Sequence, residues 1–133
     1  MAPEVEDSSS KSLEKILEWY PTVPPAVDTL VHILIQKQAA WLPQSQAVCS
    51  WDGDLSYAEL DDLSSRLAAY LAAQGVGSET IVPLCFEKSV WAIVSVLAVL
   101  KAGGVFLLLD PSQPIARLKS IVGQTGANFA LSS

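Results

Sequence analysis

Residues 89–110 constrain the fold more than any other part of the chain. Between Ser89 and Leu109 the only charged residue is Lys101, and Gly103-Gly104 divides the run into a helix-length part and a strand-length part. Ser89 suits a helix N-cap, Lys101 falls in the last turn, and Gly103 can adopt the left-handed conformation that ends a helix. The pattern predicts a helix over 89–102 followed by a buried strand over 105–109.

The predicted helix over 89–102 has almost no polar face. A helix that is apolar all round must be covered on every side, in a large core or in a membrane. The strand over 105–109 likewise expects cover on both faces. The neighbouring helices, over 57–74 and 115–124, each offer only one apolar stripe, so we expect an apolar patch to stay exposed and to favour self-association. A membrane span over 90–109 has the right length, but Lys101 and the glycine pair argue against it.

Composition and charge exclude several classes of function. Of the 133 residues, 50% are hydrophobic and 17% are charged, and the net charge is −6. The chain has no cluster of Lys and Arg, which argues against a nucleic-acid partner. Cys49 and Cys85 match no metal-ligand spacing and are expected to be small core residues. The acidic start of the chain lacks an apolar signal region, so the expected location is the cytoplasm.

The N-terminal part divides into a tail and a linker-like segment. Residues 1–10 are acidic and serine-rich and are expected to be disordered. Residues 11–27 predict a short amphipathic helix followed by the stiff run Val23-Pro24-Pro25. From Asp28, a good N-cap, apolar residues repeat at helical spacing until Pro43. His32 near the start of that helix has no second ligand nearby and is expected to be a surface or capping residue.

Two short strands and a long helix follow. Residues 47–51 and 55–56 predict a hairpin through Asp52-Gly53, and turn chemistry accounts for Asp52 and Asp54 better than paired catalytic carboxylates do. Ser56 and Glu59 form a capping box at the start of the helix over 57–74. Gly75 ends that helix, and the pair Gly75 and Gly77 follows a helix and precedes a strand, which is the wrong order for a dinucleotide site.

From Thr80 onward the predicted order is strand, helix, strand, helix, strand. Continuous apolar strands separated by helices indicate right-handed crossovers and a parallel sheet. The last helix begins at Pro114 and ends near Gly126, and a further strand begins at 128–131. The expected fold class is therefore α/β, as an incomplete three-layer parallel-sheet unit with an N-terminal helical linker.

Two motifs in this framework resemble those of a known family. Residues 55–60, Leu-Ser-Tyr-Ala-Glu-Leu, resemble the first core motif of nonribosomal peptide synthetase adenylation domains, and residues 100–111 resemble the second. The second motif departs from the family pattern at Val105, Phe106 and Leu108, all of which remain apolar. The family-signature residues, expected to be structural, are Leu55, Tyr57, Glu59, Leu60, Leu100, Lys101, Ala102, Gly103, Asp110 and Pro111.

The resemblance extends to the flanking segments. Residues 81–89 and 110–114 are similar to the fungal versions of these domains. Residues 13–27 are similar to the linker between condensation and adenylation domains, with Tyr20 where asparagine is usual. The resemblance thus implies a linker-like segment over 11–27 and a truncated N-terminal portion of an adenylation (AMP-binding) domain over 28–133.

The resemblance also implies a chemistry that these residues do not carry. The complete family enzyme joins an amino acid to ATP with Mg²⁺ and passes the aminoacyl-adenylate to a phosphopantetheine carrier domain in secondary-metabolite biosynthesis. Its phosphate loop and catalytic lysine have no match here, and Lys101 followed by Ala-Gly-Gly is not a phosphate loop. We therefore expect no catalytic, cofactor-binding or metal residue in the chain, and no activity on its own. The alternative is an interaction or split-enzyme module that docks onto a condensation domain or a separately encoded remainder of the adenylation domain.

Overall fold

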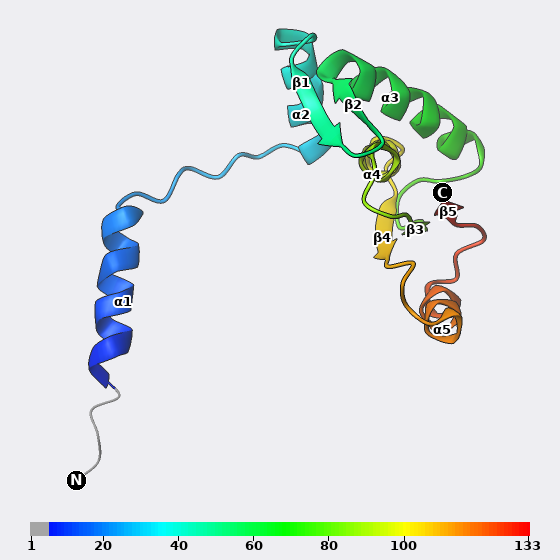
Figure 1. Ribbon diagram of the computed structural model, residues 1–133. Coiled ribbons are helices and arrows are strands. Elements are labelled where there is room, and N and C mark those ends of the chain that lie inside the picture. The colour runs from blue at the N-terminus through cyan, green and yellow to red at the C-terminus, as the bar shows by residue number, and fades with distance from the viewer. Residues whose placement is uncertain (1–5) are drawn as a thin grey trace.

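The computed structural model describes the backbone of residues 6–133 and the side chains from residue 10 onward. The chain starts with two helices and a pair of strands, and helices then alternate with short strands (Figure 1). In chain order the elements are α1 (Glu6–Trp19), α2 (Val31–Trp41), β1 (Gln46–Ser50), β2 (Gly53–Ser56), α3 (Tyr57–Ala73), β3 (Ile81–Cys85), α4 (Val90–Lys101), β4 (Val105–Leu109), α5 (Ile115–Thr125) and β5 (Leu131–Ser132).

The N-terminal helix α1 stands apart from the rest of the fold (Figure 1). It begins at Glu6, so residues 6–10 form its first turns, within the stretch 1–10 that the sequence predicts to be a disordered tail. Residues 1–5 lie outside the described residues. The side chains of residues 10–28 are all exposed, and an extended segment joins α1 to α2.

Helix α2 starts later than its sequence indicates. Asp28 was predicted as the N-cap, but Leu30 occupies that position and provides no side-chain hydrogen bond. The reason is local, since the Thr29 amide donates to the Val27 carbonyl in a turn that delays the helix. The helix ends at Trp41, just before Pro43, as predicted.

The strands β1 and β2 form the predicted antiparallel hairpin. Their register pairs Ser50 with Gly53, so the connecting residues are Trp51 and Asp52, one position earlier than predicted. Gly53 has a φ of +144°, which only glycine adopts readily, and this fixes the turn. The hairpin lies beside α3 and α4 and not in the main sheet.

The main sheet is parallel, with strand order β4-β3-β5. The crossover through α4 runs from β3 to β4, and the crossover through α5 runs in the opposite direction, from β4 past β3 to β5. Right-handed crossovers therefore place α4 and α5 on opposite faces, and the two helices lie on different sides of the strands in Figure 1. The predicted α/β fold with a parallel sheet is confirmed.

The strand β3 is central and β4 lies at an edge. Val82, Pro83 and Leu84 of β3 are all buried. The prediction that β4 is covered on both faces is wrong, because Leu108 is 62% exposed and Val105 is also exposed. Helix α4 packs on β4, whereas α5 makes no comparable contact with it, so the faces of this strand are covered incompletely.

The core forms around α4, which contributes to both of its clusters. Buried residues of the first cluster come from α3, α4, β3 and the segment after α3, and they are Ala68, Leu71, Val76, Val82, Leu84, Ala98 and Val99. The second, smaller cluster joins Leu60 of α3 to Val94 and Leu97 of α4. Helix α4 is not covered on every side, because Trp91 is 52% exposed and Ile93 is also exposed, as the apolar sequence predicted.

The apolar run over 90–109 is divided between helix α4 and strand β4. Within the described part of the chain, no helix is both long enough and apolar enough to cross a membrane.

Candidate functional site

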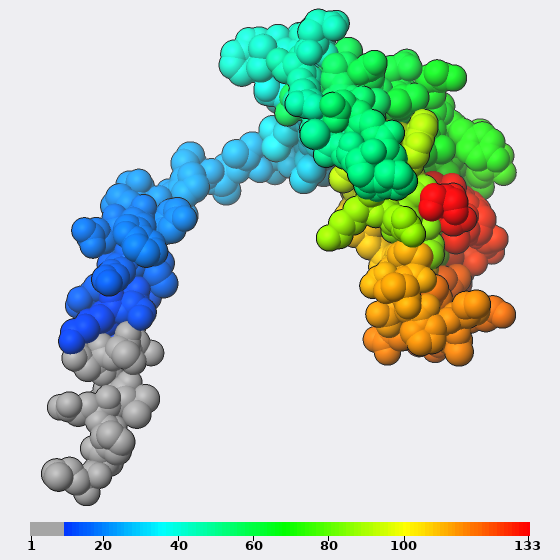
Figure 2. Space-filling view, viewed as in Figure 1, coloured from blue at the N-terminus to red at the C-terminus, as the bar shows by residue number. Residues whose placement is uncertain are grey.

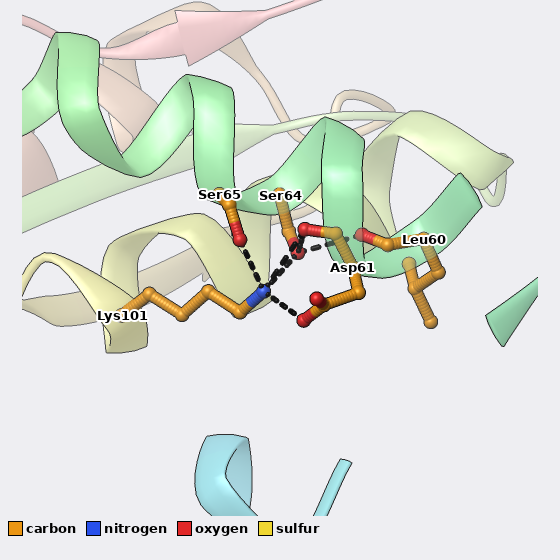
Figure 3. A network of polar contacts seen from close by, with 5 residues as sticks. All are labelled: Leu60, Asp61, Ser64, Ser65 and Lys101. Atoms are coloured by element: carbon orange, nitrogen blue, oxygen red, sulfur yellow. Dashed lines mark hydrogen bonds and ion pairs between the residues drawn. The ribbon is translucent and has the colours of Figure 1, made fainter. Parts of the chain in front are cut away.

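The two signature motifs meet where α3 packs on α4. The first motif covers β2 and the first turn of α3, and the second begins in the last turn of α4. Lys101, at the end of α4, extends its side chain to α3 (Figure 3). This lysine and its partners are the most connected polar group among the described residues.

The Lys101 ammonium has four oxygen partners on α3 (Figure 3). Its Nζ lies 2.6 Å from Asp61 Oδ1 and 3.1 Å from the Asp61 carbonyl oxygen. It also lies 2.8 Å from Ser64 Oγ and 2.9 Å from Ser65 Oγ. The lysine side chain is only 6% exposed, and that of Asp61 is 36% exposed. An ammonium has three protons, so these acceptors satisfy it completely.

Ser64 extends this network into the helix. Its hydroxyl accepts from Lys101 and donates to the Leu60 carbonyl over 2.6 Å. Ser64 is fully buried, and none of the described buried side-chain polar atoms lacks a hydrogen-bond partner. A buried cation needs this kind of pairing to be tolerated. Because its charge is neutralised and its donors are occupied, Lys101 links α4 to α3 through hydrogen bonds and an ion pair.

The first motif is organised by its capping box. Glu59 Oε2 accepts from the Ser56 amide at 2.8 Å, and Ser56 Oγ accepts from the Glu59 amide at 3.3 Å. Hydrogen bonds from the Ser56 amide and hydroxyl hold the pKa of Glu59 below its usual value. Leu60 is buried in the second core cluster, with Leu55 packed against it. Tyr57 lines a shallow apolar groove between α2 and α4.

The second motif turns the chain from α4 into β4. Leu100 lines the same groove as Tyr57, and Ala102 is the C-cap of α4. Gly103 has a φ of +82°, as the predicted end of the helix requires. The sequence named Gly104 only as part of the glycine pair and predicted no close contact there, although a Cβ would lie 2.7 Å from Val76 Cγ1 and 3.2 Å from the Thr80 carbonyl oxygen.

The second motif ends at the carboxyl end of β4, beside an open cavity. This cavity of about 700 Å³ lies between the ends of β3 and β4, and Asp110 and Pro111 are part of its wall. Hydrogen bonds from the Ser112 side chain and amide lower the pKa of Asp110, and the amide lies 2.9 Å from Asp110 Oδ1. The carboxylate therefore stabilises the turn after β4.

The hairpin is fastened to the start of α4 by contacts that the sequence did not reveal. The Asp52 carboxylate accepts from the Val90 amide at 3.1 and 3.3 Å, and Trp51 Nε1 donates to the Lys88 carbonyl at 2.6 Å. Partial burial raises the pKa of Asp52, but hydrogen bonds from the Ser50 side chain, the Val90 amide and its own backbone outweigh this and lower it. The turn residue is thus also a second cap of α4, beside Ser89, the confirmed N-cap.

Three aspartates near the signature motifs are committed to structural contacts. Asp52, Asp61 and Asp110 are each occupied by a helix, a lysine or a turn, and they do not converge. No group of three or more His, Cys, Asp or Glu that could hold a metal occurs within residues 6–133, as far as they are described. Cys49 and Cys85 are free thiols, and the neighbouring Asp54 raises the pKa of the exposed Cys49.

One sequence signal pointed to the partner of Lys101. Leu60, Ala68 and Leu71 are buried positions of α3, and Ser64 falls between them on the same face. A serine on the apolar stripe of a helix requires a buried hydrogen-bond partner. The sequence alone did not name that partner, which lies 37 residues away on another helix.

Comparison with curated proteins finds long fungal relatives. Nonribosomal peptide synthetase SIDD of Beauveria bassiana is 50% identical over 125 residues, which are 94% of this chain and 7% of the relative. Nonribosomal peptide synthetase TES of Alternaria alternata is 53% identical over 120 residues, which are 90% of this chain and 2% of the relative. The chain therefore spans only a small part of the relatives that it matches.

Solved structures and a family model agree with these relatives. The nonribosomal peptide synthetase FmoA3, in a form bound to alpha-methyl-L-serine-AMP, superposes with a TM-score of 0.79 and 27% identity, over 88% of this chain and 13% of that one. The Klebsiella oxytoca NpsA N-terminal subdomain shares the fold, with a TM-score of 0.70 at 24% identity over 77% of this chain and 26% of that one. The model of the AMP-binding enzyme family matches residues 35–133. The chain therefore belongs to the AMP-binding enzyme family, and its relatives are the adenylation domains of nonribosomal peptide synthetases, those of fungi in particular.

Proposed function

We propose that this chain is the opening segment of an adenylation domain of a nonribosomal peptide synthetase, and that its role is to build the scaffold of that domain. In the complete enzyme, ATP and Mg²⁺ would activate an amino acid as its adenylate, for transfer to a phosphopantetheine carrier domain. The observation that carries the proposal is the family match over residues 35–133, together with about 50% identity to fungal synthetases.

The contacts of the signature residues support a scaffold role. Lys101 is committed to three side chains and a carbonyl of α3, Glu59 caps α3, and Asp110 closes a turn. Adenylate formation needs cations and donors aimed at the charge that develops on phosphorus. Since each of these groups is already paired with another part of the chain, residues 1–133 alone should not form an adenylate.

A graft tests this proposal directly. Residues 35–133 would replace the matching segment in the adenylation domain of the Beauveria bassiana relative, and amino-acid-dependent exchange of pyrophosphate into ATP would be measured. We expect the grafted domain to retain exchange with the recipient's own substrate, while residues 1–133 alone stay at background. A graft that is folded but inactive would contradict the scaffold role, and exchange by the isolated chain would contradict its inactivity.

A second candidate function is docking through the N-terminal segment. Helix α1 exposes Leu13, Ile16 and Leu17 at helical spacing, and the extended segment after it separates it from the α/β core. A condensation domain or another module could cover this apolar face. The test is binding of residues 1–133 to the condensation domain that precedes the matched segment in a relative. Leu13→Glu with Ile16→Glu should abolish binding, whereas Glu14→Lys, elsewhere on α1, should not.

A further inference from the structure

The tip of the β1–β2 hairpin carries the dipeptide Asp52-Gly53 at the surface of the core. Both residues are exposed, and the blue-green hairpin lies on the outside of the molecule in the space-filling view (Figure 2). The space beside Gly53 is open, because a Cβ at this position would meet nothing within 4 Å. The side-chain carboxyl group of Asp52 is therefore followed by an unhindered backbone amide, in a place that water reaches.

An aspartate followed by an unhindered amide is able to close a five-membered succinimide ring. The amide nitrogen of the next residue attacks the side-chain Cγ, a C–N bond forms, and the hydroxyl of the carboxylic acid leaves with the amide proton as water. Water then opens the ring at one of its two carbonyl carbons. Opening at the side-chain carbonyl restores aspartate, and opening at the main-chain carbonyl gives isoaspartate, so water is the only reagent required.

The fold opposes this ring closure by holding the Asp52 carboxylate. The carboxylate accepts from the Val90 amide at 3.1 and 3.3 Å, and its lowered pKa keeps it ionised at neutral pH. An ionised carboxylate resists attack because it has no hydroxyl to lose. The indole of Trp51 also fixes the tip, since its Nε1 donates to the Lys88 carbonyl at 2.6 Å. Ring closure therefore requires the hairpin tip to detach from the start of α4.

We propose that Asp52-Gly53 is a site of isoaspartate formation, and that the attachment of the hairpin tip to α4 controls the rate. The reaction proceeds from the detached tip, whose population is set by a local opening equilibrium. Isoaspartate lengthens the main chain by one methylene group and leaves the free carboxylate on Cα, so the Val90 amide loses its acceptor. The modification therefore makes the detachment of the hairpin lasting. This inference goes beyond the scaffold role and does not depend on it.

Water labelled with oxygen-18 tests the proposal on residues 1–133, because each ring opening adds one solvent oxygen to the aspartate that reacted. The folded chain would be incubated at pH 7 in labelled water and digested in ordinary water. Mass spectrometry of the peptides would locate the label, and electron-transfer fragmentation would identify isoaspartate. We expect both at Asp52. Asp54 is the internal control, since it is exposed on the same hairpin but is followed by leucine, and it should take up far less label.

Trp51→Phe tests the control by the hairpin. It removes the donor to the Lys88 carbonyl and keeps an aromatic ring, so labelling of Asp52 should rise about fivefold, the factor expected for one lost hydrogen bond. Trp41→Phe is the matched control, because Trp41 is 75% exposed against 78% for Trp51, and its indole makes no hydrogen bond among the described residues. It should leave the rate unchanged. Both variants should keep the circular dichroism spectrum of the parent, and the chain unfolded in urea should label fastest.

Three results would overturn the proposal. Label at Asp52 no higher than at Asp54 would remove the modification site. Equal rates in the parent, in Trp51→Phe and in urea, or an equal rise in Trp41→Phe, would remove the control by the hairpin. The purified isoaspartate form should also exchange the Val90 amide hydrogen faster than the parent, and unchanged exchange there would contradict the loss of the cap. The graft of residues 35–133 tests the scaffold role separately, since it measures activity and not modification.

Discussion

At the scale of single residues, Lys101 and Gly104 make the contacts that join the second signature motif to the rest of the core. Lys101 ties α4 to α3 by charge-assisted hydrogen bonds, and Gly104 lets the chain pass close to Val76 and Thr80. Both act through packing between segments distant in sequence. Their replacement should therefore affect folding before it affects any chemistry.

Lys101→Met should destabilise the chain by about 2–4 kcal/mol, because it leaves Ser64 and Asp61 without the cation they face in a partly buried site. Urea denaturation measures this free energy of unfolding. The control is Asp62→Asn, which removes an exposed 3.7 Å ion pair with Arg66 and should cost less than about 0.5 kcal/mol. Equal losses in the two variants would show that the Lys101 network is no stronger than a surface pair.

Gly104→Ala should destabilise the chain by about 1–3 kcal/mol, since the added methyl group would overpack the contact with Val76. Gly123→Ala is the control. Gly123 lies within α5, and its Cβ would meet nothing within 4 Å. That substitution should stabilise the helix by up to about 1 kcal/mol. If thermal denaturation ranks the two variants the other way round, the close approach at Gly104 is not a packing constraint.

At the scale of elements, the hairpin is fastened to the buried helix α4. Trp51 and Asp52 at its tip bond to the backbone at 88 and 90, so the β1–β2 turn and the start of α4 form one unit. An exposed hairpin of two short strands is marginal on its own. The hydrogen bonds to the start of α4 therefore stabilise the hairpin beyond what the pairing of its two strands provides.

Asp52→Asn should make the stability of the chain less dependent on pH. The pKa of Asp52 is lowered in the folded state, so its contribution is present above the unfolded value of about 3.9 and is lost as pH falls through the folded value. The parent should therefore melt at a higher temperature than the variant at pH 7, and the difference should shrink below pH 4. The pKa values of Glu59 and Asp110 are also lowered, but both residues are present in the parent and in the variant, so their effect cancels in the comparison. A difference that is constant from pH 7 to pH 3 would contradict a charged cap.

At the scale of the whole molecule, the chain divides into an α/β core and an exposed N-terminal helix. Residues 10–28 are exposed, while the core clusters draw on α3, α4, β3 and the segments between them. The core also leaves apolar residues exposed at Trp91, Ile93 and Leu108. Removal of the N-terminal helix should therefore have little effect on the stability of the core, whereas the exposed apolar residues of the core should affect its association.

Removal of residues 1–25 should change the free energy of unfolding of the rest by no more than about 1 kcal/mol, the scale of changes away from core contacts. Chemical denaturation of the shortened and full chains measures the difference. Leu71→Ala, at a fully buried core position, provides the comparison and should cost about 2–5 kcal/mol. Loss of cooperative unfolding on deletion would show that α1 belongs to the core.

Exposed apolar residues on α4 and β4 should make the isolated chain bind a hydrophobic dye and self-associate, because contiguous apolar surface favours association. Dye fluorescence and sedimentation velocity at tens of micromolar test this, and Trp91→Glu should reduce both signals. A monomer that binds no dye would show that residues 1–133 close their own core.

The sequence by itself determined the elements and their order, because the signals for these are local. Ser56 and Glu59 predict a capping box, Gly103 predicts the end of α4, and the apolar run at 105–109 predicts a strand, and each feature is present where expected. Only the tertiary structure decided which segments meet. The partners of Lys101, the second role of Asp52 as a cap of α4, and the edge position of β4 all depend on residues 24 or more positions apart. Hydrogen bonds and packing between residues so far apart produce no repeating pattern in a sequence. The secondary structure of these residues was therefore predicted correctly, but their contacts were not.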